Sequence, residues 1–244
     1  MNLPARWTSV ELILQDVLYI SYRLPADRVR PHLPSGISLA TVGEDEVFVT
    51  ALITRVERAR LARLPSPRWS YAQVGIMTYV QPTEGTQPAV FCLRQGVTHA
   101  RWARVLRWFG VPVDEVAVQI RAERTKRNEY TTFRVQGDWQ GPFHVEARQV
   151  APRLESLPPF PSGMDAVIYL VDALEGLYAA NGRVYRVDMW HPRPQPRVGE
   201  VSRVEFPMLG RVLDLAPEEV AQPTVVLMAP RNHYLLHLPP RRRA

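Results

Sequence analysis

The sequence predicts a mainly β fold (β-rich α+β) in which an antiparallel sheet system is accompanied by two main helices. Three observations support this prediction. Segments that alternate apolar and polar residues recur along most of the 244-residue chain, as in half-buried strands. Clusters of glycine, proline and other turn residues separate these segments. Only two longer stretches place apolar residues at helical spacing. Short strands without regularly interleaved helices favour an antiparallel system, closed as a barrel or packed as two layers.

The first half of the chain supplies five predicted strands, a short helix and the first of the two main helices. Residues 8–23 alternate as one strand whose core face holds Leu12, Leu14, Leu18, Ile20 and Tyr22. A short helix is predicted over 25–33, because proline suits a first helical position. Two hairpins follow, because polar turns containing glycine separate 37–42 from 47–60 and 70–80 from 89–97. Residues 99–110 then fit the first main helix, which ends at a glycine.

The second half returns to strands around one more helix. Strands are predicted over 115–124, 129–139 and 143–152. Ser162 and Asp165 have capping-box spacing, and an apolar stripe that reaches Tyr178 extends the predicted helix to Gly182. Further strands are predicted over 183–190, 200–206, 224–229 and 233–238. No composition shift demands a boundary, so we expect a single domain, 1–244, with flexible termini at 1–8 and 239–244.

Charge, cysteine content and apolar runs narrow the function classes. The net charge of +6 would suit a nucleic-acid partner, but the basic residues are scattered and no recognised nucleic-acid motif is present, so such a partner is not favoured. Cys92 is the only cysteine, cannot form an internal disulfide, and is predicted to be a small buried residue. No apolar run reaches the ~20 residues of a membrane span, and the first residues lack the layout of a secretion signal. We therefore expect a cytoplasmic protein with no membrane partner.

Three familiar kinds of site are excluded. His233 and His237 are predicted to lie in a strand, where four residues span about 13 Å, so they cannot chelate one metal ion together. The glycines belong to no GxGxxG or GxxxxGK phosphate loop. Ser162 stands at the start of a helix and not in a GxSxG elbow. The sequence therefore predicts neither a metal site nor another cofactor.

A set of polar residues remains at strand ends, namely Arg23, Tyr71, Gln73, Arg94 and His99. Their surroundings resemble the acetoacetate decarboxylase-like superfamily. Its opening segment resembles YISYRLPADRVRPHLPSGISLA, its Tyr-x-Glu-x-Gly strand resembles SYAQVGIMTYV, and its Arg-Glu-x-x-Gly-x-Pro-Lys-Lys segment resembles LRQGVTHARWA. An uncharacterised branch of the superfamily is similar to YLVDALEGLYAANGRVYRVDMWHPRPQPRVGEV. Together the similarities touch most of residues 10–238.

The resemblance implies an antiparallel β-barrel or cone, with the two main helices outside and a central pocket for a small oxo-acid or a similar carboxylate metabolite. Relatives in the superfamily commonly assemble, so a homo-oligomer stays open. One departure bears on the chemistry. His99 and Ala100 stand where the family motif has two lysines, and an imidazole cannot form the iminium that the family's decarboxylases use. Lys126, the only lysine, is predicted in a charged turn, so Schiff-base decarboxylation is not expected.

Roles for the remaining residues follow from their chemistry. Arg23 matches the family and could hold a carboxylate through two hydrogen bonds. Gln73, which replaces a glutamate, and Tyr71 would bind the substrate with Arg94 nearby. His99 would move a proton, with Tyr71 or His191 as second donor.

Other interpretations stay open. His99 is equally well explained as a helix N-terminal residue that packs against Trp102. The whole protein could be a non-catalytic ligand-binding module on the same barrel. A basic nucleic-acid-associated protein is a weaker alternative.

Overall fold

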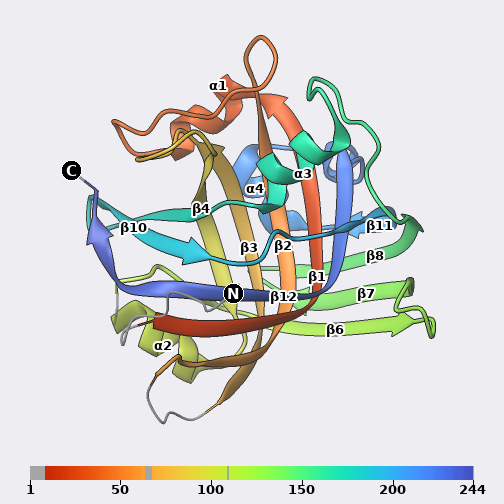
Figure 1. Ribbon diagram of the computed structural model, residues 1–244, viewed down its shortest axis with the longest axis horizontal. Coiled ribbons are helices and arrows are strands. Elements are labelled where there is room, and N and C mark those ends of the chain that lie inside the picture. The colour runs from red at the N-terminus through yellow and green to blue at the C-terminus, as the bar shows by residue number, and fades with distance from the viewer. Residues whose placement is uncertain (1–8, 64–67, 109, 244) are drawn as a thin grey trace.

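The structure is a computed structural model and describes residues 9–63, 68–108 and 110–243 (Figure 1). Its strands are β1 (Ser9–Pro25), β2 (Glu46–Leu61), β3 (Trp69–Val80), β4 (Ala89–Val97), β5 (Asp114–Glu115), β6 (Ala117–Arg124), β7 (Tyr130–Asp138), β8 (Pro142–Ala151), β9 (Glu175–Ala180), β10 (Arg183–Trp190), β11 (Arg197–Glu205) and β12 (Val225–Arg242). Its helices are α1 (Ala26–Val29), the 3-10 turn η1 (Arg30–His32), α2 (Ala100–Trp108), α3 (Gly163–Val171), α4 (Pro207–Leu213) and α5 (Pro217–Val220).

Seven of the described strands close into a barrel. They pair in the order β1-β2-β3-β4-β9-β10-β12, and β12 pairs again with β1. These pairings are antiparallel except that of β4 with β9. The same long β12 also pairs with β11, from which β8, β7 and β6 continue the sheet beside the barrel (Figure 1). This four-strand extension is called the second sheet below. The predicted mainly β, antiparallel barrel is therefore confirmed.

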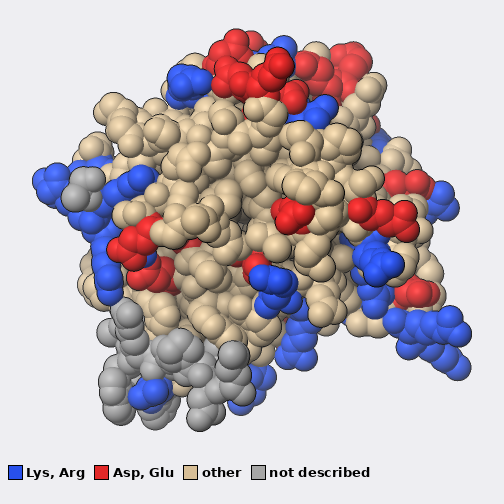
Figure 2. All heavy atoms as spheres, turned by 45° about the horizontal axis from the view of Figure 1, so that its top comes forward, with Lys and Arg blue, Asp and Glu red and all other residues tan. Residues whose placement is uncertain are grey.

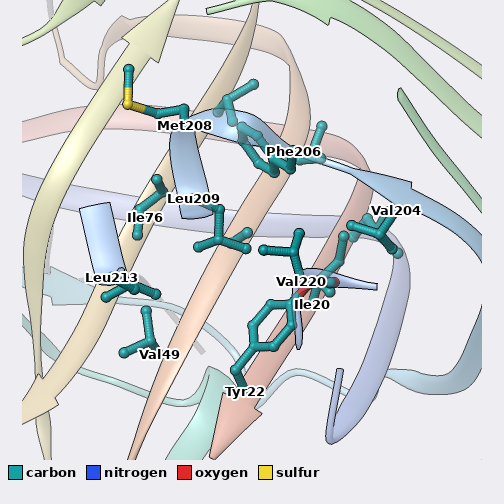
Figure 3. Close-up of a cluster of buried hydrophobic side chains, with 14 of the residues drawn as sticks. Ile20, Tyr22, Val49, Ile76, Val204, Phe206, Met208, Leu209, Leu213 and Val220 are labelled. Carbon is teal, nitrogen blue, oxygen red and sulfur yellow. The ribbon is translucent and has the colours of Figure 1, made fainter. Parts of the chain in front are cut away.

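The barrel strands bury side chains on both faces. On the outer face, Ile20, Val49 and Ile76 pack with side chains of α4 and of the second sheet (Figure 3). On the inner face, Tyr19, Phe48 and Tyr79 form a separate cluster with residues of α3. Phe48 lies near the start of β2 and Tyr79 near the end of β3, and both rings contact Tyr169, so α3 covers that end of the barrel. Burial on both faces explains why these strands are so rich in apolar and aromatic residues.

The strict alternation predicted for residues 8–23 is wrong, because β1 has a bulge at Asp16. The backbone of Asp16 has φ 54°, and the register of β1 with β2 shifts between Gln15 and Leu18. A bulge inserts one extra residue, so the side chains beyond it change face. Leu14 therefore packs in the inner cluster with Tyr19, while Leu18 belongs to the outer core.

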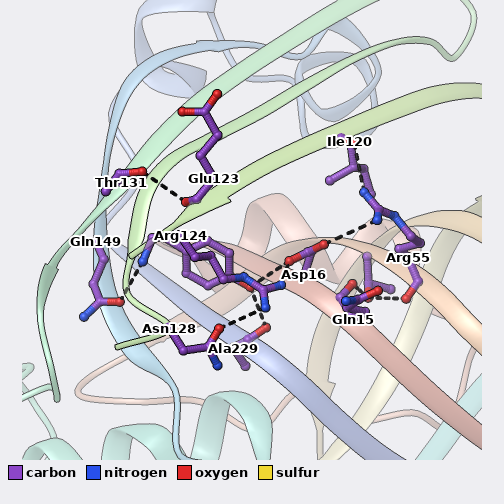
Figure 4. Close-up of polar contacts among 12 residues, drawn as sticks. Gln15, Asp16, Arg55, Ile120, Glu123, Arg124, Asn128, Thr131, Gln149 and Ala229 are labelled. Atoms are coloured by element: carbon purple, nitrogen blue, oxygen red, sulfur yellow. Dashed lines mark hydrogen bonds and ion pairs between the residues drawn. The ribbon is translucent and has the colours of Figure 1, made fainter. Parts of the chain in front are cut away.

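The bulge also aims the Asp16 carboxylate at the second sheet. Asp16 is 3% exposed, pairs with Arg124 of β6, and lies 3.7 Å from the guanidinium of Arg55 (Figure 4). The Tyr130 hydroxyl donates to the same carboxylate at 3.2 Å. These contacts fix β6 and β7 against the barrel.

The second main helix is much shorter than predicted. α3 does start at the predicted cap, where Asp165 N donates to Ser162 Oγ at 3.2 Å, but it ends at Val171. Residues 175–180, predicted as helix, form β9 because they pair with β4 and β10 on either side. The apolar stripe that suggested a long helix thus belongs to two elements, a helix and a strand.

Smaller differences lie elsewhere in the chain. Residues 37–42 make only isolated bridges, at Leu39 and Val42, and not the predicted strand. The sequence gives no expectation of α4 and α5, which are short. β12 continues through Pro230 as one strand, and Arg242 pairs with Tyr185 of β10, so the segment 239–242, predicted as part of a flexible tail, takes part in the barrel.

Candidate functional site

The predicted carboxylate anchor and the predicted proton carrier lie at opposite ends of the barrel. Arg23 of β1 pairs with Phe48 of β2, and the next residue of β2, Val49, pairs with Thr78 of β3. Arg23 is therefore at the same level of the barrel as the end of β3. Thr98 N donates to Ala72 O, so His99 is level with Tyr71 at the start of β3. Eight residues of strand separate these levels, about 26 Å at the usual rise. One small ligand cannot contact both side chains.

Arg23 is already engaged with the protein. Its Nε lies 3.4 Å from Glu46 Oε2, and its NH1 donates to the Pro158 carbonyl at 3.0 Å. Its side chain is 35% exposed. Arg23 therefore ties the segment before α3 to the rim of the barrel, where Glu46 balances its charge.

His99 lies outside the barrel at its other end. It is exposed, its backbone has φ 84°, and its carbonyl accepts the Ala103 N–H at 3.2 Å, which starts α2. The proposed packing against Trp102 involves a side chain outside the described residues. Arg94 also lies on the outer face, where its NH2 is 2.8 Å from Asp114 Oδ2.

His191 is buried, but both of its ring nitrogens are occupied. Nε2 lies 3.0 Å from the Ala173 carbonyl and Nδ1 lies 3.1 Å from the Pro192 carbonyl. Its ring contacts Tyr234, with 4.5 Å between the ring centroids. His191 therefore joins the end of α3 to the segment after β10, and its buried ring is held between two backbone carbonyls.

Tyr71 and Gln73 are the two predicted site residues that the structure places on the inner face of the barrel. The register of β3 with β4 shows that Gln95 and Cys92 lie on the same inner face, because Gln95 pairs with Gly75 and Cys92 pairs with Met77. Further pairs place the inner side chains of β9 and β10 beside Cys92, first Tyr178 and then Tyr185. The rings of Tyr178 and Tyr185 stack with 5.4 Å between centroids.

The middle of the inner face is partly accessible to solvent. The residues that are only half-buried there are Leu52, Gln73, Met77, Cys92, Gln95, Tyr185, Val187 and Met189, although the thiol of Cys92 itself is desolvated. Their neighbours on the outer face, such as Ile76, Phe91 and Leu177, are almost fully buried. A Cβ atom added at Gly75 would make ordinary van der Waals contacts, with the Met77 methyl at 3.7 Å and the Arg94 carbonyl at 3.8 Å, and no clash. The middle of the inner face is therefore less tightly packed than the outer face, and this part, called the hollow below, is the candidate place for a small ligand.

Hydroxyl groups form a network where this face meets α3. Ser21 Oγ and Thr50 Oγ1 are 2.8 Å apart, Thr50 Oγ1 is 2.8 Å from the Tyr79 hydroxyl, and Tyr79 donates to the Leu170 carbonyl at 2.7 Å. Beside it, Asn232 Nδ2 donates to the Tyr19 hydroxyl at 3.1 Å. Burial raises the pKa of Tyr19 and Tyr79 and brings that of Tyr71 to about 12. These phenols therefore keep their protons at neutral pH and act as hydrogen-bond donors.

In the part of the chain that the structure describes, charged groups lie on the inner face only at its rims. Arg23 is at one rim, and Arg183 and Arg242, which pair with Ala180 and Tyr185, are exposed at another. Among the described residues, the inner positions between these rims are uncharged. Burial raises the pKa of the Cys92 thiol to about 12, so it is protonated as well. Lys126 lies in the exposed turn between β6 and β7, outside the barrel.

Two other kinds of site have no support in the part of the chain that the structure describes. It contains no group of three or more histidine, cysteine, aspartate or glutamate residues that could hold a metal ion. Within the same residues, no helix has the length and apolar character needed to cross a membrane. On the face drawn in Figure 2, acidic and basic side chains are dispersed around the margin, and most of the middle is uncharged. That face offers no continuous basic surface for nucleic acid.

Sequence reasoning missed most of the inner-face residues, including Tyr19, Thr50, Gln95, Tyr178 and Asn232. One signal was present, because alternation along 70–80 puts Tyr79 on the same face as Tyr71 and Gln73. Attention to strand ends led instead to Arg23, Arg94 and His99, which lie at the rims or outside.

Comparison with known proteins agrees with this architecture. Residues 12–233 match the family DUF2071, described as an uncharacterized conserved protein. A search of curated proteins finds no match. Among solved structures, the enduracididine biosynthesis enzyme MppR complexed with the condensation product of pyruvate and imidazole 4-carboxaldehyde has a TM-score of 0.60 and 18% identity, covering 98% of this chain and 90% of that chain.

Two further structures carry the superfamily name. An acetoacetate decarboxylase-like enzyme from Sphingomonas wittichii RW1 has a TM-score of 0.60 and 12% identity, covering 98% of this chain and 94% of that chain. Acetoacetate decarboxylase from Legionella pneumophila has a TM-score of 0.62 and 12% identity, covering 100% of this chain and 93% of that chain. At such identities the likeness shows the fold alone. The chain belongs to the DUF2071 family, and it shares its fold with acetoacetate decarboxylase-like enzymes.

Proposed function

We propose that this protein is an enzyme that binds a small carbonyl compound on the inner face of its seven-strand barrel and acts on it without forming an imine. The observation that carries the proposal is the partly accessible inner face, where protonated phenols and amides surround a hollow. The enduracididine biosynthesis enzyme MppR, which shares the fold, has also been solved in complex with pyruvate. This likeness supports a small ketone or oxo-acid as the class of ligand.

The available groups suit acid catalysis by hydrogen bonding. A phenol that donates to a carbonyl oxygen stabilises the negative charge that develops there when a water molecule accepts the α-proton and an enolate forms, or when water adds to the carbonyl carbon. Lys126, the only lysine of the sequence, lies in an exposed turn. The proposed reactions are therefore enolisation, hydration or dehydration, or a lyase step without a covalent intermediate. Arg23, bound to Glu46 and Pro158, is not part of this proposal.

Two measurements on the full chain test this function. Exchange of α-hydrogens in deuterated buffer, followed by proton NMR for a panel of small ketones and oxo-acids, should exceed the buffer rate for at least one compound. The Lys126→Gln variant should match the parent rate, because this side chain is remote from the barrel. Borohydride treatment in the presence of the active compound should leave the protein mass unchanged. A reduced adduct on Lys126 would contradict the proposal.

A non-catalytic binding module is the second candidate, and one observation favours it. The sequence offers His99 and His191 as proton carriers. His99 lies away from the inner face, and the ring nitrogens of His191 lie beside two backbone carbonyls. Such a module would show ligand-dependent stabilisation of roughly RT ln(1 + [L]/Kd) with no exchange for any compound. Exchange above the buffer rate excludes it.

A further inference from the structure

The hydroxyl group of Tyr178 on β9 is buried and has no hydrogen-bond partner within the described residues. Tyr178 as a whole is 5% exposed. A buried hydroxyl without a partner costs free energy, and native structures retain few of them unless a ligand, an ion or a water molecule completes the bond. This hydroxyl group therefore marks a place where a bound molecule would be stabilised.

Strand register places Tyr178 on the inner face, beside the accessible hollow. Tyr178 pairs with Cys92 of β4 and with Tyr185 of β10. Cys92 in turn pairs with Met77 and lies 3.8 Å from the amide oxygen of Gln95, measured from its sulfur. Burial, reinforced by Tyr185, raises the pKa of Tyr178 to about 12, so its hydroxyl is a donor at neutral pH.

Most charged residues of the neighbouring strands lie on the outer face and have partners there. Arg183 and Arg242, which pair with Ala180 and Tyr185, are on the inner face but are exposed at its rim. Arg186 on β10 is 2.6 Å from Asp188 and 3.7 Å from Glu175. Arg94 on β4 is 2.8 Å from Asp114. A second buried carboxylate, Asp172 at the end of α3, lies 3.3 Å from Arg193. An anionic ligand held between the rims would find no cation on the described inner positions there to offset its loss of water, which is costly.

We infer that the inner face binds an uncharged ligand whose carbonyl oxygen accepts a hydrogen bond from Tyr178. The amides of Gln73 and Gln95 lie on the same face and can pair with its other polar atoms, and Leu52, Met77 and Met189 line its apolar part. This inference rests on the proposed function and narrows its ligand class, from carbonyl compounds in general to neutral ones.

The test compares pairs of probes that have the same shape and differ in charge. The pairs are 2,4-pentanedione with acetoacetate, and acetophenone with benzoate, and their dissociation constants for the full chain are measured by ligand-observed NMR. The neutral member of a pair should bind at least about tenfold more tightly than its carboxylate. Equal or tighter binding of both carboxylates, or no binding by either neutral probe up to about 10 mM, overturns the inference.

Variants then locate the donor. Tyr178→Phe should weaken binding of the neutral probe about tenfold, the value of one hydrogen bond, while the melting temperature of the free protein stays the same or rises. Tyr22→Phe is the matched control, because Tyr22 donates to the Val220 carbonyl at 2.6 Å on the outer face. It should lower the melting temperature and leave binding unchanged. Unchanged binding in Tyr178→Phe contradicts the inference.

The two proposals fail in different ways. Carboxylate-selective binding with α-hydrogen exchange would support the proposed enzyme and overturn the neutral ligand class. Tyr178-dependent binding of neutral probes without exchange of any compound would support this inference and contradict the enzyme.

Discussion

Tyr79 on β3 donates its hydroxyl proton to the Leu170 carbonyl of α3 at 2.7 Å, which fixes the helix over one end of the barrel. The same hydroxyl lies 2.8 Å from Thr50 Oγ1. Tyr79→Phe removes one hydrogen-bond partner from the Leu170 carbonyl and one from the Thr50 hydroxyl. We expect the free energy of unfolding to fall by about 1–3 kcal/mol, measured by urea denaturation.

Tyr178→Phe is the control for this effect. It also removes a hydroxyl from a buried tyrosine, but that hydroxyl has no partner within the described residues. The free energy of unfolding should therefore stay the same or increase. A larger loss in Tyr178→Phe than in Tyr79→Phe would mean that the hydrogen-bond assignments of the inner face are wrong.

Substitutions at Gly75 and Gly96 test which face of the sheet has room for additional atoms. A Cβ atom at Gly75 meets nothing closer than 3.7 Å, whereas a Cβ atom at Gly96 would lie 2.4 Å from Val116 Cγ1 on the outer face. We expect Gly75→Val to keep or improve stability, because valine suits a strand, and to weaken binding of 2,4-pentanedione at least about tenfold by filling the hollow.

Gly96→Ala should instead lower the free energy of unfolding by about 1–3 kcal/mol through overpacking. Calorimetric melting and NMR titration of both variants separate the two effects. Strong destabilisation by Gly75→Val would show that the inner face is tightly packed there.

Asp16 should be one of the most sensitive polar positions outside the hollow. Its carboxylate is 5% exposed and meets Arg124 and Arg55. Asn tolerates the positive φ at this position, so Asp16→Asn removes mainly the charge. Leaving two arginines without their buried partner should cost about 3–5 kcal/mol, measured by urea denaturation. Glu205→Gln, which breaks the exposed pair with Arg203, should cost less than about 1 kcal/mol.

Cys92 gives a pH-dependent test of burial on the inner face. Burial raises its pKa to about 12, and only the thiolate reacts with iodoacetamide. At pH 8 alkylation of the native protein should be more than about a thousandfold slower than in urea, where the pKa is about 8.5. The native rate should keep rising with pH through pH 10. A plateau near pH 9 would show an ordinary thiol.

The same shift has a consequence for stability. Because the folded thiol ionises at higher pH than the unfolded one, its contribution to stability is complete below about pH 8.5 and decreases as the pH rises toward the folded pKa of about 12. The raised pKa values of Tyr71 and Tyr178, both about 12, act in the same direction above pH 10.

The barrel could be predicted from the sequence because its strands show local alternation, but three features depend on contacts distant in sequence. The bulge at Asp16 is stabilised by Arg124, more than a hundred residues away, so nothing local marks it. The residues of β9 fit helical spacing as well as strand spacing, and pairing with β4 decides between them. Misreading β9 as helix hid Tyr178, because a helical residue has no place on the inner face of a sheet.

The candidate site was predicted only in part for a related reason. Tyr71 and Gln73 are on the inner face as residues of one alternating strand. Arg23 and His99 were grouped because of their order along the chain, but the order of residues in the sequence does not show at which end of the barrel each one lies. Their separation follows from the register of β1, β2 and β3, which only the fold supplies.

Methionine methyl NMR tests the central claim, a ligand site inside the barrel, most directly. Of the six methionines, Met77 and Met189 are on the accessible inner face, Met208 and Met228 are buried in the outer core, and Met164 is exposed on α3. With 13C-methyl labelling, saturating 2,4-pentanedione should shift the Met77 and Met189 resonances and leave those of Met208, Met228 and Met164 in place. Shifts confined to the last three, with Met77 and Met189 unmoved, would contradict the account.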